Sequence, residues 1–217
     1  MTGVFIKRKI RKYEKRLAAH ANDPEYIQDL ADLYVQISQP DKARTYYQQA
    51  IETYYQRHSR LGEDTTFILD VCGKLLEIDP LNLLAHETLG QEYCSLGEFD
   101  DALKLYTAFA RKLVQAGQYA KAIEQYRHVL VLTPHDIEIR QQCFSLLWKL
   151  RKKNEAIQEL EKIAELAERQ GNLVKAVECY RKAVKIMPSN SRLQAELSRV
   201  SQLTRTLEKP LRLVVNK

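Results

Sequence analysis

The sequence is poor in cysteine, glycine and tryptophan. Its 217 residues include four cysteines, seven glycines and one tryptophan. The cysteines, at positions 72, 94, 143 and 179, lie far apart and form no Cys-x-x-Cys pair, which excludes a dense disulfide framework and a cysteine-rich zinc site. We therefore expect reduced, mostly buried thiols, no bound metal and no other cofactor.

Long apolar runs are missing as well. No stretch approaches the roughly 18 apolar residues that a membrane-spanning helix needs. The N-terminal apolar patch GVFI precedes the nearby positive charges, which is the reverse of a secretory signal. These features predict a cytoplasmic protein.

Sequence motifs that carry catalysis are also absent. The chain has no His-Glu-x-x-His, no glycine-rich phosphate loop and no Gly-x-Ser-x-Gly. Asp100 and Asp101 stand at the start of a predicted helix, where negative charge complements the backbone dipole. We predict a protein that is not an enzyme and has no catalytic residues.

What the sequence does contain is a repeat. GQYAKAIEQYRHVLVLTP, at 117–134, returns as GNLVKAVECYRKAVKIMP at 171–188. Apolar residues recur at intervals of three and four between the prolines, and Pro80, Pro134 and Pro188 follow one another at intervals of 54 residues. The pattern predicts an all-helical chain built from copies of one unit.

Five predicted turns between helices share one pattern of flanking residues. Gly97, Gly117 and Gly171 are each followed, at five and nine residues, by an alanine and a tyrosine, and weaker copies surround Ser38 and Arg151. Large apolar residues eight and four positions before the turn form one ridge of the first helix, and a small residue seven positions before it allows close backbone approach. Glycine suits the positive φ at such a helix end.

The segments HETLGQEYCSLGEFDDALKLY and QYAKAIEQYRHVLVLTP show that the chain resembles the tetratricopeptide repeat family over roughly residues 25–188. Ser38 and Arg151 replace the turn glycine, and Ile68 and Cys72 stand where an alanine and an aromatic residue are expected. The resemblance implies an all-α, right-handed helical-repeat solenoid of about ten to eleven helices.

The turns at 97, 117, 151 and 171 are spaced by 20, 34 and 20 residues, so each 54-residue module is a 34-residue repeat with a 20-residue overlap. The helices near 100–115 and 154–169 then each serve two repeats. We expect a basic helix at 1–22, a solenoid at 23–188 and a capping helix with a tail at 189–217. The solenoid modules are 24–79, 80–133 and 134–187, with one irregular joint at 56–66. The last residues, PLRLVVNK, are expected as an extended tail or a strand.

The family resemblance also implies a concave groove that holds a segment of a partner. The family's groove positions correspond here to Gln28, Asp32, Val35, Gln36, Glu87, Gln91, Cys94, Ser95, Gln141, Ser145, Trp148 and Lys149. Trp148 is either a binding anchor or part of the core at a module joint. Residues 25–37 hold neither Lys nor Asn, which disfavours the clamp for chaperone tails known in some family members.

These features predict a non-enzymatic scaffold or adaptor that binds a partner protein or peptide. Chains with similar KAIxxYRxxLxxxP modules recur in bacterial regulators, so we expect a bacterial protein. Self-association is expected wherever a terminal module leaves apolar surface uncovered. Glu161, Glu165 and Glu168 form an acidic line on one helix face, which we interpret as solvated.

The N-terminal segment carries the net charge of the chain. Residues 5–16 hold seven Lys or Arg and one Glu, a formal charge of +6 that equals the charge of the whole chain. The positive residues are Lys7, Arg8, Lys9, Arg11, Lys12, Lys15 and Arg16, and they surround an apolar stripe of Ile6, Ile10, Tyr13 and Leu17. The helix is either a cap on the first module or a docking element for an acidic partner or an anionic membrane.

The alternative function is therefore a peripheral membrane or nucleic-acid associated assembly factor that acts through this helix. The tyrosine pairs at 46, 47, 54 and 55 lie beside basic residues, but no nucleic-acid motif accompanies them, which disfavours nucleic acid as a ligand. We expect Tyr47 and Tyr54 in the core, and Tyr46 and Tyr55 half exposed.

Overall fold

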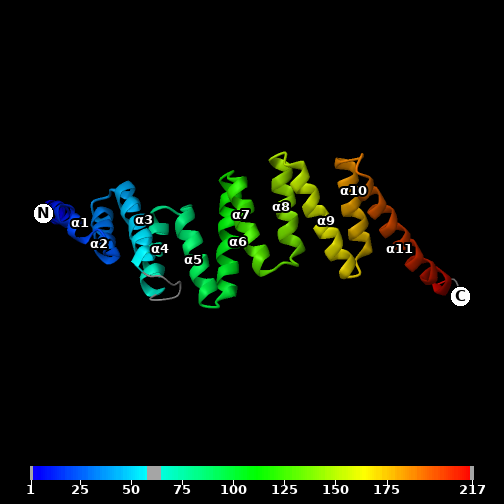
Figure 1. Cartoon of the computed structure of the whole chain (residues 1–217), viewed down its shortest axis with the longest axis horizontal. Coiled ribbons are helices and arrows are strands. Elements are labelled where there is room, and N and C mark those ends of the chain that lie inside the picture. Colours follow the sequence, from blue (N-terminus) through cyan, green and yellow to red (C-terminus); the bar gives the residue numbers. More distant parts are fainter. Residues whose placement is uncertain (1, 58–64, 216–217) are drawn as a thin grey trace. The chain divides into compact units, whose positions relative to one another are not determined.

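The computed structural model describes residues 2–57 and 65–215, with side chains for 4–57 and 65–206. Within these ranges the chain forms eleven α-helices and no β-strand, which confirms the predicted all-α class (Figure 1). The helices are α1 (Thr2–His20), α2 (Pro24–Gln36), α3 (Pro40–Arg57), α4 (Thr65–Ile78), α5 (Leu83–Ser95), α6 (Phe99–Gln115), α7 (Tyr119–Leu132), α8 (Ile137–Lys149), α9 (Lys153–Arg169), α10 (Leu173–Ile186) and α11 (Ser191–Val215). Most of the predicted irregular joint, residues 58–64, lies outside the described residues.

The helices form two compact units, Met1–Lys112 and Leu113–Lys217, and the boundary between them falls within α6. In the first unit α1 packs on α2, α2 on α3, α3 on α4 and α4 on α5. In the second unit α7 packs on α8, α8 on α9, α9 on α10 and α10 on α11. Packing between helices that are neighbours in sequence is the arrangement of a helical-repeat protein.

Helix α9 packs against two partners at once, α8 and α10. Its buried residues, Ala156, Ile157, Leu160, Ile163, Ala164, Leu166 and Ala167, cover more than one stripe of the helix, as packing on two sides requires. This packing is compatible with the prediction that the helix near 154–169 serves two repeats, which stays a prediction because other helices, such as α3 and α10, also pack on two neighbours.

The five predicted turns have one backbone geometry. Gly97, Gly117 and Gly171 have φ of 77°, 73° and 75°, and Ser38 and Arg151 are the non-glycine residues with positive φ in the described part of the chain, at 55° and 59°. Each turn also carries a pair of hydrogen bonds in which two successive amides, starting with the left-handed residue, bond back to the helix that ends there. At Arg151, for example, Arg151 N donates to Trp148 O over 3.0 Å and Lys152 N donates to Leu147 O over 2.9 Å.

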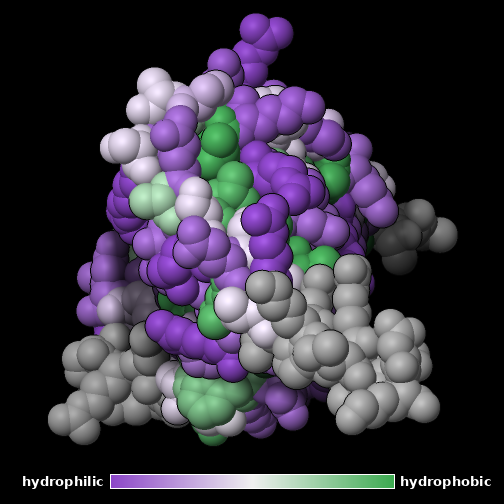
Figure 2. Space-filling view, turned by 90° about the vertical axis from the view of Figure 1, so that its right-hand side faces the viewer, coloured by the Kyte–Doolittle hydropathy of each residue, from purple (hydrophilic) through white to green (hydrophobic). Residues whose placement is uncertain are grey.

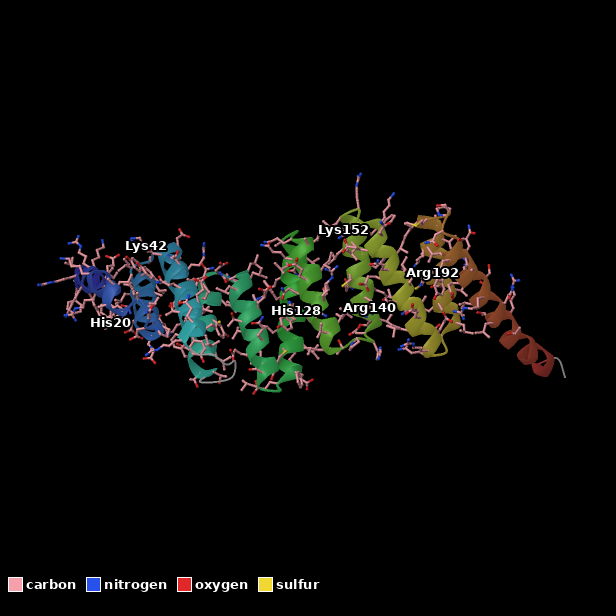
Figure 3. All side chains as sticks on the ribbon, viewed as in Figure 1. His20, Lys42, His128, Arg140, Lys152 and Arg192 are labelled. Atoms are coloured by element: carbon pink, nitrogen blue, oxygen red, sulfur yellow. The ribbon has the colours of Figure 1, made fainter. Side chains whose placement is uncertain are left out.

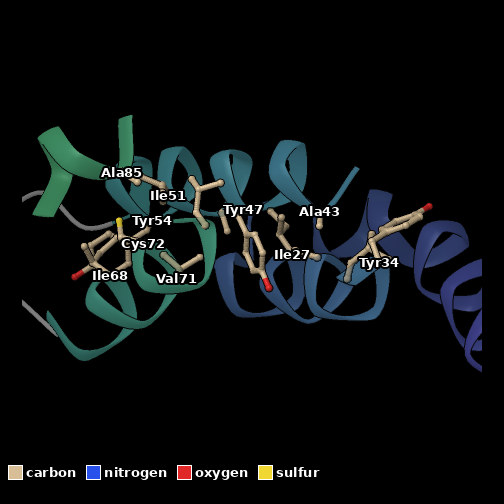
Figure 4. Packing of buried hydrophobic residues seen from close by; sticks show 14 of the residues in the cluster. Ile27, Tyr34, Ala43, Tyr47, Ile51, Tyr54, Ile68, Val71, Cys72 and Ala85 are labelled. Carbon is tan, nitrogen blue, oxygen red and sulfur yellow. The ribbon is translucent and has the colours of Figure 1, made fainter. Parts of the chain in front are cut away.

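The core of the first unit is built largely from tyrosine and aliphatic residues of α2, α3 and α4 (Figure 4). Tyr47 and Tyr54 are each 2% exposed, whereas Tyr46 and Tyr55 are half-buried, as predicted. Tyr47 donates a hydrogen bond to Asp32 Oδ1 over 2.5 Å, so its buried ring keeps a partner for the hydroxyl. Gly90 of α5 lies against the ring of Tyr106 in α6.

The core of the second unit extends from α9 across α10 to the first turns of α11. Leu193 and Val200 of α11 are fully buried in a cluster with Ile163 and Tyr180. The outer face of the molecule seen in Figure 2 is mainly hydrophilic, with hydrophobic residues in small, separate patches. A terminal helix of a repeat protein needs such a polar exterior, because no further repeat covers it.

The expectation of an extended tail or strand at the C-terminus is wrong for residues 210–215, which continue α11 as far as Val215. Alternation of apolar and polar residues over so short a stretch does not distinguish a strand from a helix.

Candidate protein-interaction surfaces

The outward face of α8 carries four of the predicted groove residues. Gln141, Ser145, Trp148 and Lys149 are all exposed, and their spacing of four, three and one places them on the same side of the helix. Ser145 Oγ donates a hydrogen bond to Gln141 O over 2.9 Å, so the serine is turned back onto its own helix.

Trp148 is 47% exposed, which makes it a surface residue rather than a core residue. Its ring is stacked beside Phe144, with 6.5 Å between ring centroids and an interplanar angle of 23°. Its backbone carbonyl accepts the hydrogen bond that closes the turn at Arg151. The indole is thus presented to solvent from a defined helix end.

A hollow of about 410 Å³ adjoins Trp148. It is lined by Phe144 and Trp148 of α8, Lys153 of α9, and Lys182, Lys185 and Ile186 of α10. We call it the Trp148 hollow. Three of its six lining residues are lysines, and none is acidic.

The three lysines are exposed, and none of them forms an ion pair with any residue whose side chain is described. Arg140, labelled in Figure 3, differs from them, because its guanidinium pairs with Glu159 of α9 over 3.0 Å. The positive charge of the hollow is therefore available to an anionic group from outside.

The predicted groove positions of the first unit have a different environment. Gln28 Nε2 donates to Asp70 Oδ2 over 2.5 Å, and Lys74 Nζ lies 3.0 Å from an oxygen of Asp32. Together with the Tyr47 hydroxyl, these bonds join α2, α3 and α4. Gln28 and Asp32 are therefore engaged within the protein, while the predicted positions Gln36 and Gln91 are exposed and Glu87 is half-buried.

The acidic line on α9 is not simply solvated, because it forms ion pairs with neighbouring side chains. Arg199 donates two hydrogen bonds to the Glu168 carboxylate, over 2.8 and 3.0 Å. Arg192, labelled in Figure 3, lies 3.7 Å from Glu161, and Glu165 pairs with Lys162 over 3.0 Å. Two of the three carboxylates thus contact arginines of α11, which the sequence spacing on α9 alone does not reveal.

Helix α1 packs on α2 through the predicted stripe. Ile10 is 5% exposed within the core cluster, and Ile6, Tyr13 and Leu17 pack against that cluster. The Tyr13 and Tyr26 rings are stacked with 4.6 Å between centroids, and the Tyr26 hydroxyl donates to Tyr13 O over 3.0 Å. This contact is the one expected of a cap.

The rest of α1 forms a basic surface. Lys7, Arg8, Lys9, Arg11, Lys12, Lys15 and Arg16 are all exposed, and none of them has an ion-pair partner among the described side chains. Two apolar residues, Val4 at 79% and Phe5 at 71% exposure, lie beside them. We call these nine residues the α1 basic face.

Groups that carry chemistry are sparse in the described part of the chain. No group of three or more His, Cys, Asp or Glu side chains that could hold a metal ion occurs there. Burial raises the pKa of the Cys72 and Cys143 thiols to about 12, so both are protonated at neutral pH. No described helix has the length and apolar character needed to cross a membrane.

Two family models, both described as Tetratricopeptide repeat, match this chain at residues 24–56 and 160–190. The first match spans α2 and nearly all of α3, and the second spans most of α9 and all of α10. Each match therefore contains one helix pair and the left-handed turn that joins it. This chain therefore contains tetratricopeptide repeats at these two places. No curated protein matches its sequence.

Three solved structures to which this chain is similar are described as tetratricopeptide repeat proteins or domains. The TPR domain of P58(IPK) is 16% identical, with 96% of this chain and 63% of that chain covered and a TM-score of 0.33. This chain thus spans less than two thirds of that domain. YrrB, described as a TPR protein with an unusual peptide-binding site, is 16% identical with coverages of 84% and 96% and a TM-score of 0.27. A tetratricopeptide repeat protein from Parabacteroides merdae is 14% identical, with coverages of 90% and 78% and a TM-score of 0.31.

Tetratricopeptide repeat proteins generally serve as non-enzymatic scaffolds for protein–protein interaction. Sequence reasoning assigned Trp148 and Lys149 to groove positions of such a scaffold, an assignment that stays a prediction, and it did not point to Lys153, Lys182 or Lys185. Their proximity to Trp148 depends on how α8 and α10 pack around α9. The sequence signal that could have found them is the predicted sharing of the helix near 154–169, because a helix that serves two repeats has the preceding and the following helix beside it.

Proposed function

We propose that this protein is a scaffold or adaptor without enzymatic activity, and that it binds a segment of a partner protein on the outward face of α8. The observation that carries the proposal is the position of Trp148. A large aromatic side chain that is 47% exposed, beside a hollow on the surface, has the character of an interface anchor.

The neighbouring residues support such a role. Phe144 backs the indole, and Lys149 Nζ lies 5.0 Å from the centroid of the Tyr119 ring, so polar and aromatic groups surround the anchor. Gln141 adds an exposed amide on the same side of α8. A partner segment along this face meets an apolar centre with a polar rim, which is the usual anatomy of an interface.

The test is a selection of peptides from a random display library on the intact protein, followed by affinity measurements on the protein and its variants. Trp148→Ala is expected to weaken the selected peptides by about 2 kcal/mol, or roughly 30-fold. Val174→Ala is the matched control, because Val174 is an apolar residue of the same unit that is 60% exposed and does not line the hollow. Equal binding by the wild type and Trp148→Ala would remove the proposal.

A second candidate function rests on the α1 basic face, whose seven cations have no ion-pair partner among the described side chains and lie beside the exposed Val4 and Phe5. Clustered cations gain about 1 kcal/mol each near an anionic lipid surface. Apolar side chains next to them can enter the boundary between headgroups and acyl chains. The combination supports peripheral attachment to an anionic membrane.

Flotation with phosphatidylserine vesicles and with neutral phosphatidylcholine vesicles tests this second function. Binding is expected to the anionic vesicles alone, to fall as salt is added, and to weaken in Phe5→Ser. A control variant is Val131→Ser in α7, which alters an exposed apolar residue at 76% exposure far from α1 in sequence. Binding to single-stranded DNA without binding to vesicles would instead support the nucleic-acid alternative.

A further inference from the structure

The Trp148 hollow combines two kinds of side chain that recognise different parts of a ligand. Phe144, Trp148 and Ile186 supply apolar surface, and Lys153, Lys182 and Lys185 supply positive charge. From this composition we infer that the hollow recognises an acidic peptide segment, in which a hydrophobic side chain contacts Trp148 and neighbouring carboxylates contact the lysines. The inference rests on the proposed function and specifies the chemistry of its partner.

The charge of the hollow is not balanced within the protein. Other basic residues of the same unit, in contrast, do form ion pairs. Arg127 pairs with Glu155 over 2.9 Å, Arg140 pairs with Glu159 over 3.0 Å and Arg199 pairs with Glu168 over 2.8 Å. These arginines serve contacts between helices, whereas the three lysines of the hollow have no such partner among the described side chains.

The geometry of the helices explains why the lysines gather there. Helix α9 packs against both α8 and α10. The chain reverses direction at Arg151 and again at Gly171, so the C-terminal ends of α8 and α10 lie at the same end of α9 as Lys153. Lys182 and Lys185 are three residues apart, which places both on one side of α10.

The charge and the apolar surface together favour a peptide over other anions. A free phosphate would use the lysines and leave Trp148 and Ile186 without a contact. An acidic segment with one leucine or phenylalanine uses both parts of the hollow, and its carboxylates complement the lysines. The hollow, at about 410 Å³, has room for one or two side chains rather than for a folded domain.

The experiment measures the affinity of labelled peptides for the intact protein by fluorescence anisotropy. One set of peptides carries a central leucine or phenylalanine flanked by glutamates, and the matched set carries glutamines in their place. Inorganic phosphate and an oligothymidylate are the other probes. The glutamate peptides are expected to bind at least about tenfold more tightly than the glutamine peptides, with affinity that falls as salt rises.

Two variants with the same change of net charge separate the hollow from the general charge of the surface. Lys182→Glu/Lys185→Glu is expected to weaken the glutamate peptides by about tenfold or more. Lys121→Glu/Arg181→Glu changes exposed residues of α7 and α10 that do not line the hollow, so it should leave the affinity within about twofold. Helical circular dichroism checks that both variants are folded.

Each outcome decides between the inference and the proposed function. If glutamate and glutamine peptides bind equally but Trp148→Ala abolishes binding, the inference is wrong and the proposed function stands. If neither set binds, the inference is wrong, and the peptides selected from the random library decide the proposed function separately; binding of oligothymidylate alone supports the nucleic-acid alternative. If phosphate competes fully with the glutamate peptides in both the wild type and Trp148→Ala, the hollow is an anion site without peptide recognition, which also overturns the inference.

Discussion

Gly90 and Tyr106 are in direct contact across α5 and α6. A β-carbon placed on Gly90 would lie 2.2 Å from Tyr106 Cζ, well inside van der Waals distance. Gly90 holds the position where the repeat pattern requires a small residue seven positions before the turn. The contact explains why the repeat pattern has a small residue at this position. The two helices approach too closely there to leave room for a side chain on α5.

Gly90→Ala should lower the free energy of unfolding by about 1–3 kcal/mol, because the methyl group forces the Tyr106 ring or the helices apart. Gly73→Ala in α4 is the matched control, since its added β-carbon would meet no atom within 4 Å apart from the neighbouring backbone of its own helix. That substitution should raise stability by roughly 0.5–1 kcal/mol through helix propensity. Chemical denaturation of both variants measures the difference, and equal effects would contradict the close packing of Gly90.

Ser38 and Arg151 adopt left-handed backbone conformations that favour glycine. Ser38→Gly and Arg151→Gly should each raise the free energy of unfolding, by about 1 kcal/mol, because a non-glycine residue is strained at φ of 55° or 59°. The reverse test is Gly171→Ala, which introduces a side chain at φ of 75° and should destabilise by a similar amount. Thermal melts measure the melting temperature of each variant relative to the wild type. A shift in the same direction for all three variants would contradict the left-handed geometry of these turns.

His86 makes stability depend on pH. It is 5% exposed and stacked on Phe109 with 3.6 Å between ring centroids, and burial lowers the pKa of the imidazole below its ordinary value of 6.5. The unfolded chain therefore binds a proton more readily than the folded chain does. The free energy of unfolding is therefore unaffected by the titration of this group above pH 6.5. It decreases as the pH falls through that value towards the lower pKa of the folded state.

Urea unfolding of the wild type and His86→Phe between about pH 8 and pH 5 tests this effect. The phenylalanine keeps an aromatic ring beside Phe109 but does not titrate, so the variant should lose less stability on acidification. His135→Gln, at an exposed position, should keep the slope of the wild type. The same slope in His86→Phe and the wild type would show that burial of His86 has no effect on proton binding.

The two sides of α1 should respond differently to substitution. Ile10→Ala removes a side chain that is 5% exposed in the core cluster and should cost about 2–4 kcal/mol. Charge reversal at Lys7, Arg8, Lys9, Arg11 and Lys12 removes no ion pair of the described structure and should change the melting temperature little. A large loss of stability in the charge variant would show that the basic residues belong to the cap.

Much of the fold could be predicted because the spacing of residues around each turn is set by the packing of the two helices that the turn joins. The left-handed residues at Ser38 and Arg151 were identified without a glycine, because the alanine and the large apolar residue that follow them keep the spacing set by helix contact. The helical end of α11 was missed, since a short alternating stretch fits a strand and a helix equally well. The sequence assigned Trp148 to a groove position of the family and left open whether it lies in the core at a module joint, whereas the side chain is 47% exposed.

The surroundings of Trp148 could not be predicted in the same way. Lys182 and Lys185 lie more than thirty residues along the chain from Trp148, and only the packing of α8 and α10 around α9 brings them together. The ion pairs between Glu168 and Arg199, and between Glu161 and Arg192, were missed for the same reason. Contacts within one helix follow from spacing, but contacts between helices two apart depend on the tertiary arrangement.

The fluorescence emission of Trp148 is the most direct test of the proposed scaffold function. Trp148 is the single tryptophan of the sequence and is 47% exposed, so its emission reports this one surface. Addition of a peptide selected on the intact protein should shift the emission maximum to shorter wavelength, because the peptide replaces water around the indole. A peptide that binds the protein without changing the emission of Trp148 would contradict the proposed site.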